Sequence, residues 1–182
     1  LDKVLGPLAK DGMPAYEILE TYKGTDLVGI DYEPLYACAA EAAAKQHKRA
    51  HFVIADGYVT ADDGTGIVHI APAFGEDDAR VGRENGFPLI KFVDEKGVMT
   101  EETPFAGMRC KPTEKEMAAG AISADPEVLK DLSARKLLFD APKFTHSYPH
   151  CWRCDTPLIY YARESWFIKM SAVKDDLVRN NN

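Results

Sequence analysis

The sequence lacks any long hydrophobic run. Its apolar residues never approach the roughly 20 in a row that a membrane-spanning helix needs, and no signal-peptide pattern opens it. It has only 4 cysteines among 182 residues, and nothing else in it is typical of a disulfide scaffold. Internal repeats and low-complexity linkers are also missing. We therefore expect a cytoplasmic domain in a reducing compartment, with no membrane partner.

Positive charge is also scarce, because the chain carries a formal net charge of −7. This balance argues against a domain that grips nucleic acid by bulk electrostatics. The C-terminal part differs, since residues 130–182 hold more Lys and Arg than Asp and Glu. A polyanion could contact that part, although the sequence does not demand it. The hydrophobic fraction of 46% is ordinary for a globular protein with a real core.

The remaining residues alternate between strand-like and helix-like patterns. Alanine-rich or acid-capped stretches predict helices, and short apolar stretches bounded by Gly, Pro or Asp predict strands. Predicted helices cover 36–49, 76–85, 113–120 and 123–139; predicted strands cover 25–35, 51–60 and 66–71, and a hairpin turns at 95–97. Without a steady βαβ alternation, this mixture predicts an α+β fold with a curved or barrel-like mixed β-sheet and peripheral helices.

The central stretch "DDGTGIVHIAPAFGEDDARVGRENGFP", residues 62–88, combines two glycines, a histidine and an acid cluster. It matches neither the dinucleotide fingerprint nor the P-loop. His69 ends an apolar strand, and Asp78 begins a helix one loop later. A carboxylate suits a protonated amine, and an imidazole donates or accepts a hydrogen bond or limits pocket size by its bulk. Each residue also has an ordinary structural role open to it, as a first-turn acid or a half-buried histidine.

Cys151 and Cys154 bracket two residues in the spacing that directs two thiolates to one tetrahedral metal. A structural zinc site wants four ligands, so this pair supplies half of one. His146 and His150 could complete a local site, although the spacing does not require them. Two free thiols are the alternative. A redox pair is disfavoured, because no helix start after a βαβ-like strand is present.

Three segments together resemble one known family. "GTGIVHIAPAFGEDD" resembles the hallmark segment of the editing (CP1) domain of isoleucyl-tRNA synthetases, and "HSYPHCWRCDTPLIYYARESWFI" resembles the segment that returns from this domain to the catalytic core. "GTDLVGIDYEPL" also matches, so the resemblance covers most of residues 20–170. Valyl and leucyl relatives are not expected to carry histidine at position 69 or the "FGEDD" form. The Cys-containing return segment is similar to the eukaryotic-type branch.

The resemblance implies a class I synthetase editing-domain fold whose N-terminal part is missing. Residues 1–145 would form a partial editing domain, and residues 146–182 the return segment towards the catalytic core. The parent would attach isoleucine to tRNA-Ile with ATP and Mg²⁺, and this region would hydrolyse mischarged valyl-tRNA-Ile. The implied partners are the acceptor end of tRNA-Ile, its valine moiety and the rest of the synthetase chain.

The resemblance also implies residue roles. Asp78 would hold the α-ammonium of the amino acid, and His69 would exclude isoleucine from the side-chain pocket. Thr65, Gly66 and Phe74 are the expected pocket wall. Cys151 and Cys154 would bind zinc together with a second C-x-x-C upstream in the parent.

Two departures from the family pattern limit what this chain is expected to do alone. The family's threonine-rich segment and the HIGH and KMSKS signatures are all missing, and "KMSAV" at 169–173 resembles the last only superficially. We therefore expect that these 182 residues do not activate isoleucine and do not deacylate tRNA by themselves. The alternative functions are a non-catalytic zinc-knuckle module that docks tRNA or another domain, and the editing domain of a valyl or leucyl relative.

Overall fold

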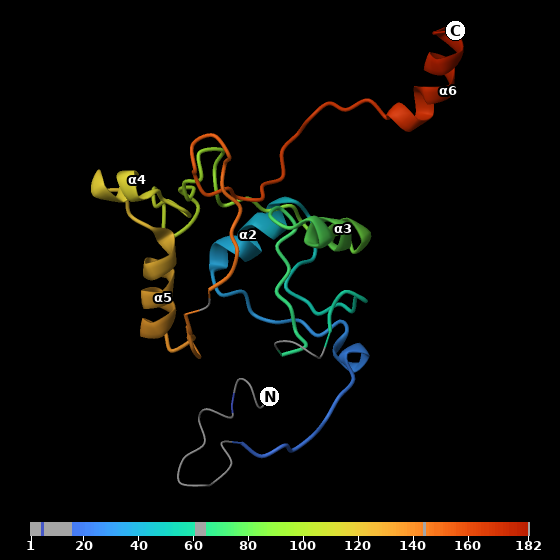
Figure 1. Ribbon diagram of the computed structural model, residues 1–182. Coiled ribbons are helices and arrows are strands. Elements are labelled where there is room, and N and C mark those ends of the chain that lie inside the picture. The colour runs from blue at the N-terminus through green and yellow to red at the C-terminus, as the bar shows by residue number, and fades with distance from the viewer. Residues whose placement is uncertain (1–4, 6–15, 61–64, 144, 182) are drawn as a thin grey trace.

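The protein consists of short helices joined by extended segments (Figure 1). The computed structural model describes residue 5 and residues 16–60, 65–143 and 145–181. In order, the helices bounded in these residues are the 3-10 helix η2 (Gly24–Leu27) and the α-helices α2 (Ala37–Lys45), α3 (Glu76–Glu84), α4 (Glu114–Ala118), α5 (Ala124–Ala134) and α6 (Met170–Asn180).

The predicted barrel-like mixed β-sheet is wrong for the described part of the chain, which contains isolated bridges but no strand. The bridges are Asp31 with Phe52, Val93 with Met99, Val98 with Arg109, Arg109 with Ser123, and His150 with Pro157. Where extended segments meet, the pairing is short: residues 29–32 and 51–53 share three backbone hydrogen bonds but form only one bridge. A sheet needs several paired strands with one buried face to be stable.

The predicted strand at 66–71 shows why the pattern misled. Its residues enter none of the bridges, and the Ile67 side chain is 70% exposed where a sheet face would have buried it. The neighbouring stretch 51–60 contributes only Phe52 to a bridge. The turn predicted at Asp63-Gly64 lies outside the described residues. Alternation of apolar and polar residues therefore predicted extended backbone here, but not its pairing.

The four helices predicted from local signals are confirmed as α2, α3, α4 and α5. Helix α3 has three acids in its first turn and Arg83 in its last turn, which suits the helix dipole. At the start of α4, Thr113 and Glu116 form the predicted capping box: the Thr113 hydroxyl accepts from Glu116 N–H and the Glu116 carboxylate accepts from Thr113 N–H. Gly97 takes a positive φ of 77° in the predicted turn, where Asp94 N–H donates to Val98 C=O at 2.8 Å.

The buried core is small and includes the inner face of α3. Val81 is fully buried, and Ala73 in the preceding loop is nearly so. Gly82 lets the helix approach the preceding loop closely, because a Cβ at this position would lie 2.9 Å from the ring of Pro72. This contact fixes α3 against residues 71–74, which is the segment that carries the candidate site.

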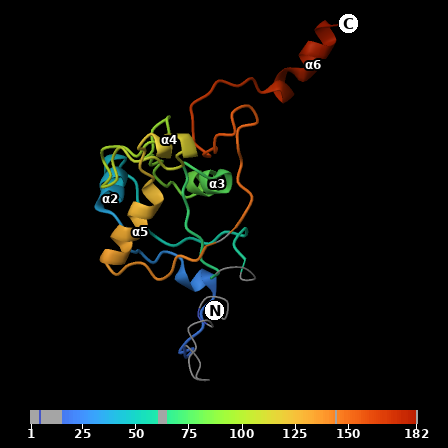
Figure 2. The same ribbon diagram turned by 60° about the vertical axis from the view of Figure 1, so that its left-hand side comes forward.

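A second contact joins α5 to the start of α2. The Tyr36 hydroxyl donates to the Asp131 carboxylate at 2.9 Å, and Arg135 both pairs with Asp131 and donates to the Leu35 carbonyl. Tyr36 also packs edge-on against Phe105. The two helices lie near each other in both views (Figures 1 and 2). Long-range polar contacts therefore replace a sheet in tying this part of the chain together.

Helix α6 was not predicted, and it stands apart from the other helices in both views (Figures 1 and 2). Trp166 is fully exposed in the extended segment before it, and Leu177 and Val178 are exposed on the helix itself. None of the helices in the described ranges is both long enough and apolar enough to cross a bilayer.

Candidate functional site

The described part of the chain encloses a cavity of about 1230 Å³ with mainly apolar walls. It lies between residues 23–39, 50–59, 66–74 and 87–105. Three of the predicted site residues line it, together with a tyrosine that the sequence argument missed. They are Gly66, His69, Phe74 and Tyr58.

Asp78 is held at the wall of this cavity by two hydrogen bonds. Ala71 N–H donates to Asp78 Oδ2 at 2.9 Å, and the Tyr58 hydroxyl donates to Asp78 Oδ1 at 3.4 Å. Both donors line the cavity, whereas Asp78 itself is not among its lining residues. The carboxylate is thus oriented by groups that face the hollow, and the first turn of α3 supplies the backbone from which it projects.

The local backbone leaves room for this carboxylate. Gly75 is the N-cap of α3, and a Cβ built on it would lie 2.7 Å from Asp78 Oδ2. The φ of Gly75 is −126°, which any residue adopts, so glycine here serves to leave space for the carboxylate in its present orientation rather than to permit the backbone conformation. The sequence contains a signal for this role of Gly75, because the glycine directly precedes the acid cluster at 76–78.

A charged fork braces the turn that carries Tyr58. Arg80 of α3 donates to both oxygens of Asp56, at 3.1 and 3.2 Å, and Asp56 Oδ1 also accepts from Tyr58 N–H at 3.2 Å. The hydrogen bond from Arg80, followed by that from the Tyr58 backbone, lowers the pKa of Asp56 below its ordinary value. Burial, and next the negative charge of Asp78, raise the pKa of Tyr58, so its hydroxyl keeps its proton and remains a donor.

His69 lines the cavity from an extended segment and is exposed. Gly66 has a positive φ of 76°, so this position favours glycine. Thr65 lies outside the lining, where its hydroxyl accepts from Ile67 N–H and caps a local turn. Phe74 packs edge-on against Tyr161, with ring centroids 5.9 Å apart. The structure therefore gathers Gly66, His69 and Phe74 at one cavity, holds Asp78 behind its wall and leaves Thr65 at its margin.

The predicted cysteine knuckle is a tight hairpin. Cys151 N–H donates to Thr156 C=O at 2.9 Å, and Asp155, with a positive φ of 56°, donates its N–H to Cys151 C=O at 2.8 Å. The side chain and then the backbone of Thr156, followed by Cys151, lower the pKa of the exposed Cys154 thiol. Both thiols thus sit on one hairpin, which suits two ligands of a tetrahedral zinc ion.

No group of three or more potential metal ligands occurs among the described residues. His146 and His150 instead direct a ring nitrogen towards neighbouring backbone carbonyls. In the described part of the chain, Cys151 and Cys154 therefore lack the two further ligands that a structural zinc site would need.

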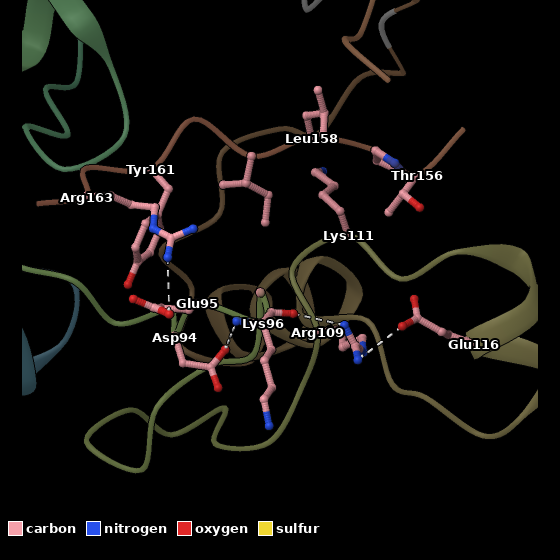
Figure 3. A pocket seen from close by; sticks show the side chains of 13 residues that line it. Asp94, Glu95, Lys96, Arg109, Lys111, Glu116, Thr156, Leu158, Tyr161 and Arg163 are labelled. Carbon is pink, nitrogen blue, oxygen red and sulfur yellow. Dashed lines mark hydrogen bonds and ion pairs between the residues drawn. The ribbon is translucent and has the colours of Figure 1, made fainter. Parts of the chain in front are cut away.

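A second, smaller pocket of about 280 Å³ lies between the 94–97 turn and the return segment 156–163 (Figure 3). Charged side chains close its walls. The ion pairs are Arg109–Glu116 at 3.1 Å, Arg163–Glu95 at 3.4 Å and Lys111–Asp125 at 2.8 Å. The Arg163–Glu95 pair joins residues 156–163 to the 94–97 turn, whereas the other two pairs lie within residues 109–125.

The chain is similar in sequence to isoleucine–tRNA ligases of several bacteria. The chain is 44% identical over 168 residues to the isoleucine–tRNA ligases of Clostridium acetobutylicum and Bacillus thuringiensis, which covers 92% of it. It is also 44% identical over 182 residues, its full length, to the ligase of Thermus thermophilus. No family model matches the chain.

The predicted resemblance to isoleucyl-tRNA synthetases is confirmed: the chain is homologous to a segment of the isoleucine–tRNA ligases. It spans about 15% of the length of these relatives.

Proposed function

We propose that this chain is the part of an isoleucine–tRNA ligase that removes valine from mischarged tRNA-Ile. Its similarity to these ligases supports the parent activity, the ATP-dependent attachment of isoleucine to tRNA. The observation that carries the editing role is the oriented carboxylate of Asp78 behind the wall of the cavity that His69 lines. Editing is needed because a missing methylene costs only about 1–3 kcal/mol in a synthesis pocket.

Asp78 selects the substrate class in this proposal. A carboxylate offers about four lone-pair sites, and Ala71 N–H and the Tyr58 hydroxyl occupy one on each oxygen. In this proposal the remaining sites accept hydrogen bonds from the α-ammonium of an aminoacyl ester. A charge-assisted bond of this kind is about twice as strong as a neutral one. An ester with a free amine is therefore favoured over one whose amine is blocked.

His69 and the cavity wall select the side chain. The imidazole takes up space that a longer side chain would need, while Gly66 lets the ester approach the backbone. Phe74 is the proposed apolar wall, and Thr65 stands at the margin. Water attacks the ester carbonyl carbon, the bond to the ribose oxygen breaks, and the ribose oxygen takes the proton. The products are valine and tRNA with a free terminal hydroxyl.

Zinc belongs to the proposal through the knuckle. Cys151 and Cys154 would supply two of four thiolate or imidazole ligands, and the metal would hold this hairpin against another segment of the parent. ATP and Mg²⁺ serve the ligase reaction of the parent.

A docking role is the second candidate, and the exposed end of the chain favours it. Trp166, Phe167 and Ile168 are exposed in the extended segment before α6, and aromatic side chains of this kind are common at interfaces. A docking module would bind tRNA or another domain without hydrolysing the ester. An Asp78→Ala variant distinguishes the two roles.

The test uses a full-length isoleucine–tRNA ligase that carries this segment. Asp78→Ala should lower the rate of valyl-tRNA-Ile hydrolysis at least tenfold, because the ammonium loses a charged partner, while isoleucine charging persists. Asp77→Ala is the matched control, since the Asp77 side chain on the same turn is 71% exposed. Undiminished valine clearance with weakened binding of tRNA would favour the docking role instead.

A further inference from the structure

The Tyr58 hydroxyl donates a hydrogen bond to Asp78, and Tyr58 also lines the cavity. We propose that Tyr58 is a positioning residue for editing: it fixes the Asp78 carboxylate in the orientation that receives the substrate ammonium. This inference rests on the proposed function, and it adds a residue that the sequence motifs did not single out.

The two donors on Asp78 come from different segments. Ala71 donates from the backbone that follows the His69 segment, and Tyr58 donates from a turn 20 residues earlier than Asp78. Because each oxygen has its own donor, rotation of the carboxylate would break both bonds. One donor alone would leave the other oxygen free to turn, so the tyrosine completes the orientation.

The hydrogen bonds between Asp56 and Arg80 hold the turn that carries Tyr58 in place. Arg80 lies two residues after Asp78 on α3 and grips both oxygens of Asp56, and Asp56 in turn accepts from Tyr58 N–H. The turn and the helix are thereby tied together beside the carboxylate as well as through it. Tyr58 is half-buried, so its ring has neighbours that restrict its motion.

Gly75 also helps to keep the Asp78 carboxylate in this orientation. Its missing Cβ leaves the space that the Asp78 carboxylate occupies when it bonds to Ala71 and Tyr58. An alanine there would lie 2.7 Å from Oδ2, closer than any real Cβ contact, and would push the carboxylate out of this orientation. Gly75→Ala therefore tests the same orientation without touching either donor.

The experiment uses Tyr58→Phe in a full-length isoleucine–tRNA ligase that carries this segment. Loss of the hydroxyl should slow single-turnover hydrolysis of valyl-tRNA-Ile about tenfold, as expected for a hydrogen bond to a charged group. Isoleucine charging should stay unchanged. Tyr160→Phe is the matched control, because Tyr160 is an exposed tyrosine outside the cavity lining. Gly75→Ala should slow hydrolysis in the same way.

A double-mutant cycle with Asp78→Asn separates positioning from a general structural role. If Tyr58 acts through Asp78, Tyr58→Phe should cost much less when Asp78 is already Asn. An equal loss in both backgrounds, or no loss in the single variant, overturns the positioning role. Intact valine clearance in Asp78→Ala would overturn the proposed function itself. The two failures are therefore distinguishable.

Discussion

At the scale of single residues, the site depends on where a few polar groups point. The family motif indicated His69 and Asp78, and the glycine and acid patterns around them are visible in the sequence. The bond from Tyr58 to Asp78 could not be predicted, because it joins residues that are 20 positions apart and depends on how two separate segments pack. The roles of His69, Asp78, Thr65, Gly66 and Phe74 in editing stay predictions until they are measured.

The Asp56–Arg80 fork makes a residue-scale prediction about pH. The pKa of Asp56 is lowered in the fold, chiefly by the hydrogen bond from Arg80, so its contribution to stability is present above the ordinary value of 3.8. That contribution is lost as the pH falls through the lowered, folded-state pKa. Asp56→Asn should therefore lower the melting temperature at pH 7, and the difference from the wild type should shrink in strongly acidic buffer.

Thermal denaturation followed by circular dichroism at the two pH values checks this. Asp77→Asn is the control, because Asp77 approaches Arg80 only to 4.0 Å and is largely exposed. A deficit of the same size at both pH values would mean that the Asp56 side chain acts through packing rather than through its charge.

At the scale of elements, local signals predicted the helices well. The acid-rich starts of α3 and α5 and the capping box of α4 depend on residues within one turn, so the sequence alone specifies them. The strand predictions failed because pairing does not depend on neighbouring residues. A strand needs a partner from elsewhere in the chain, and the alternation at 66–71 contains no information about whether one is present.

The capping box of α4 makes the prediction for this scale. Thr113→Ala removes the hydroxyl that accepts from Glu116 N–H at 3.2 Å, and α4 is only five residues long. We expect a loss of about 1 kcal/mol in unfolding free energy, the usual cost of removing a threonine N-cap. Urea denaturation measures it, with Thr60→Ala at an exposed position as the control. Equal midpoints for Thr113→Ala and the wild type would show that the cap does not stabilise α4.

At the scale of the whole molecule, the fold is open. The chain exposes 14901 Å² of accessible surface, whereas a folded monomer of 20.1 kDa is expected to expose about 8,700 Å². Many large apolar side chains are exposed, from Leu19 near the start to Trp166 and Leu177 near the end. The apolar walls of the cavity add to this exposed apolar surface.

We therefore expect the 182-residue chain on its own to bind the dye ANS, because many of its apolar side chains stay exposed to water. Dye fluorescence measures this. The chain should also fail to hydrolyse valyl-tRNA-Ile, since it lacks the threonine-rich segment of the family. The absence of dye binding, or vigorous hydrolysis by these residues alone, would contradict this view.

The sequence by itself determined helices α2 to α5, the capping box of α4 and the family, because each depends on neighbouring residues or on a run of matched positions. The tertiary structure alone decided that the extended segments would not join into a barrel and that Tyr58, Ala71 and Gly75 would frame the Asp78 carboxylate. Those outcomes depend on contacts between distant segments. Such contacts form only where burial and hydrogen bonding across the fold exceed the entropy lost in ordering the chain.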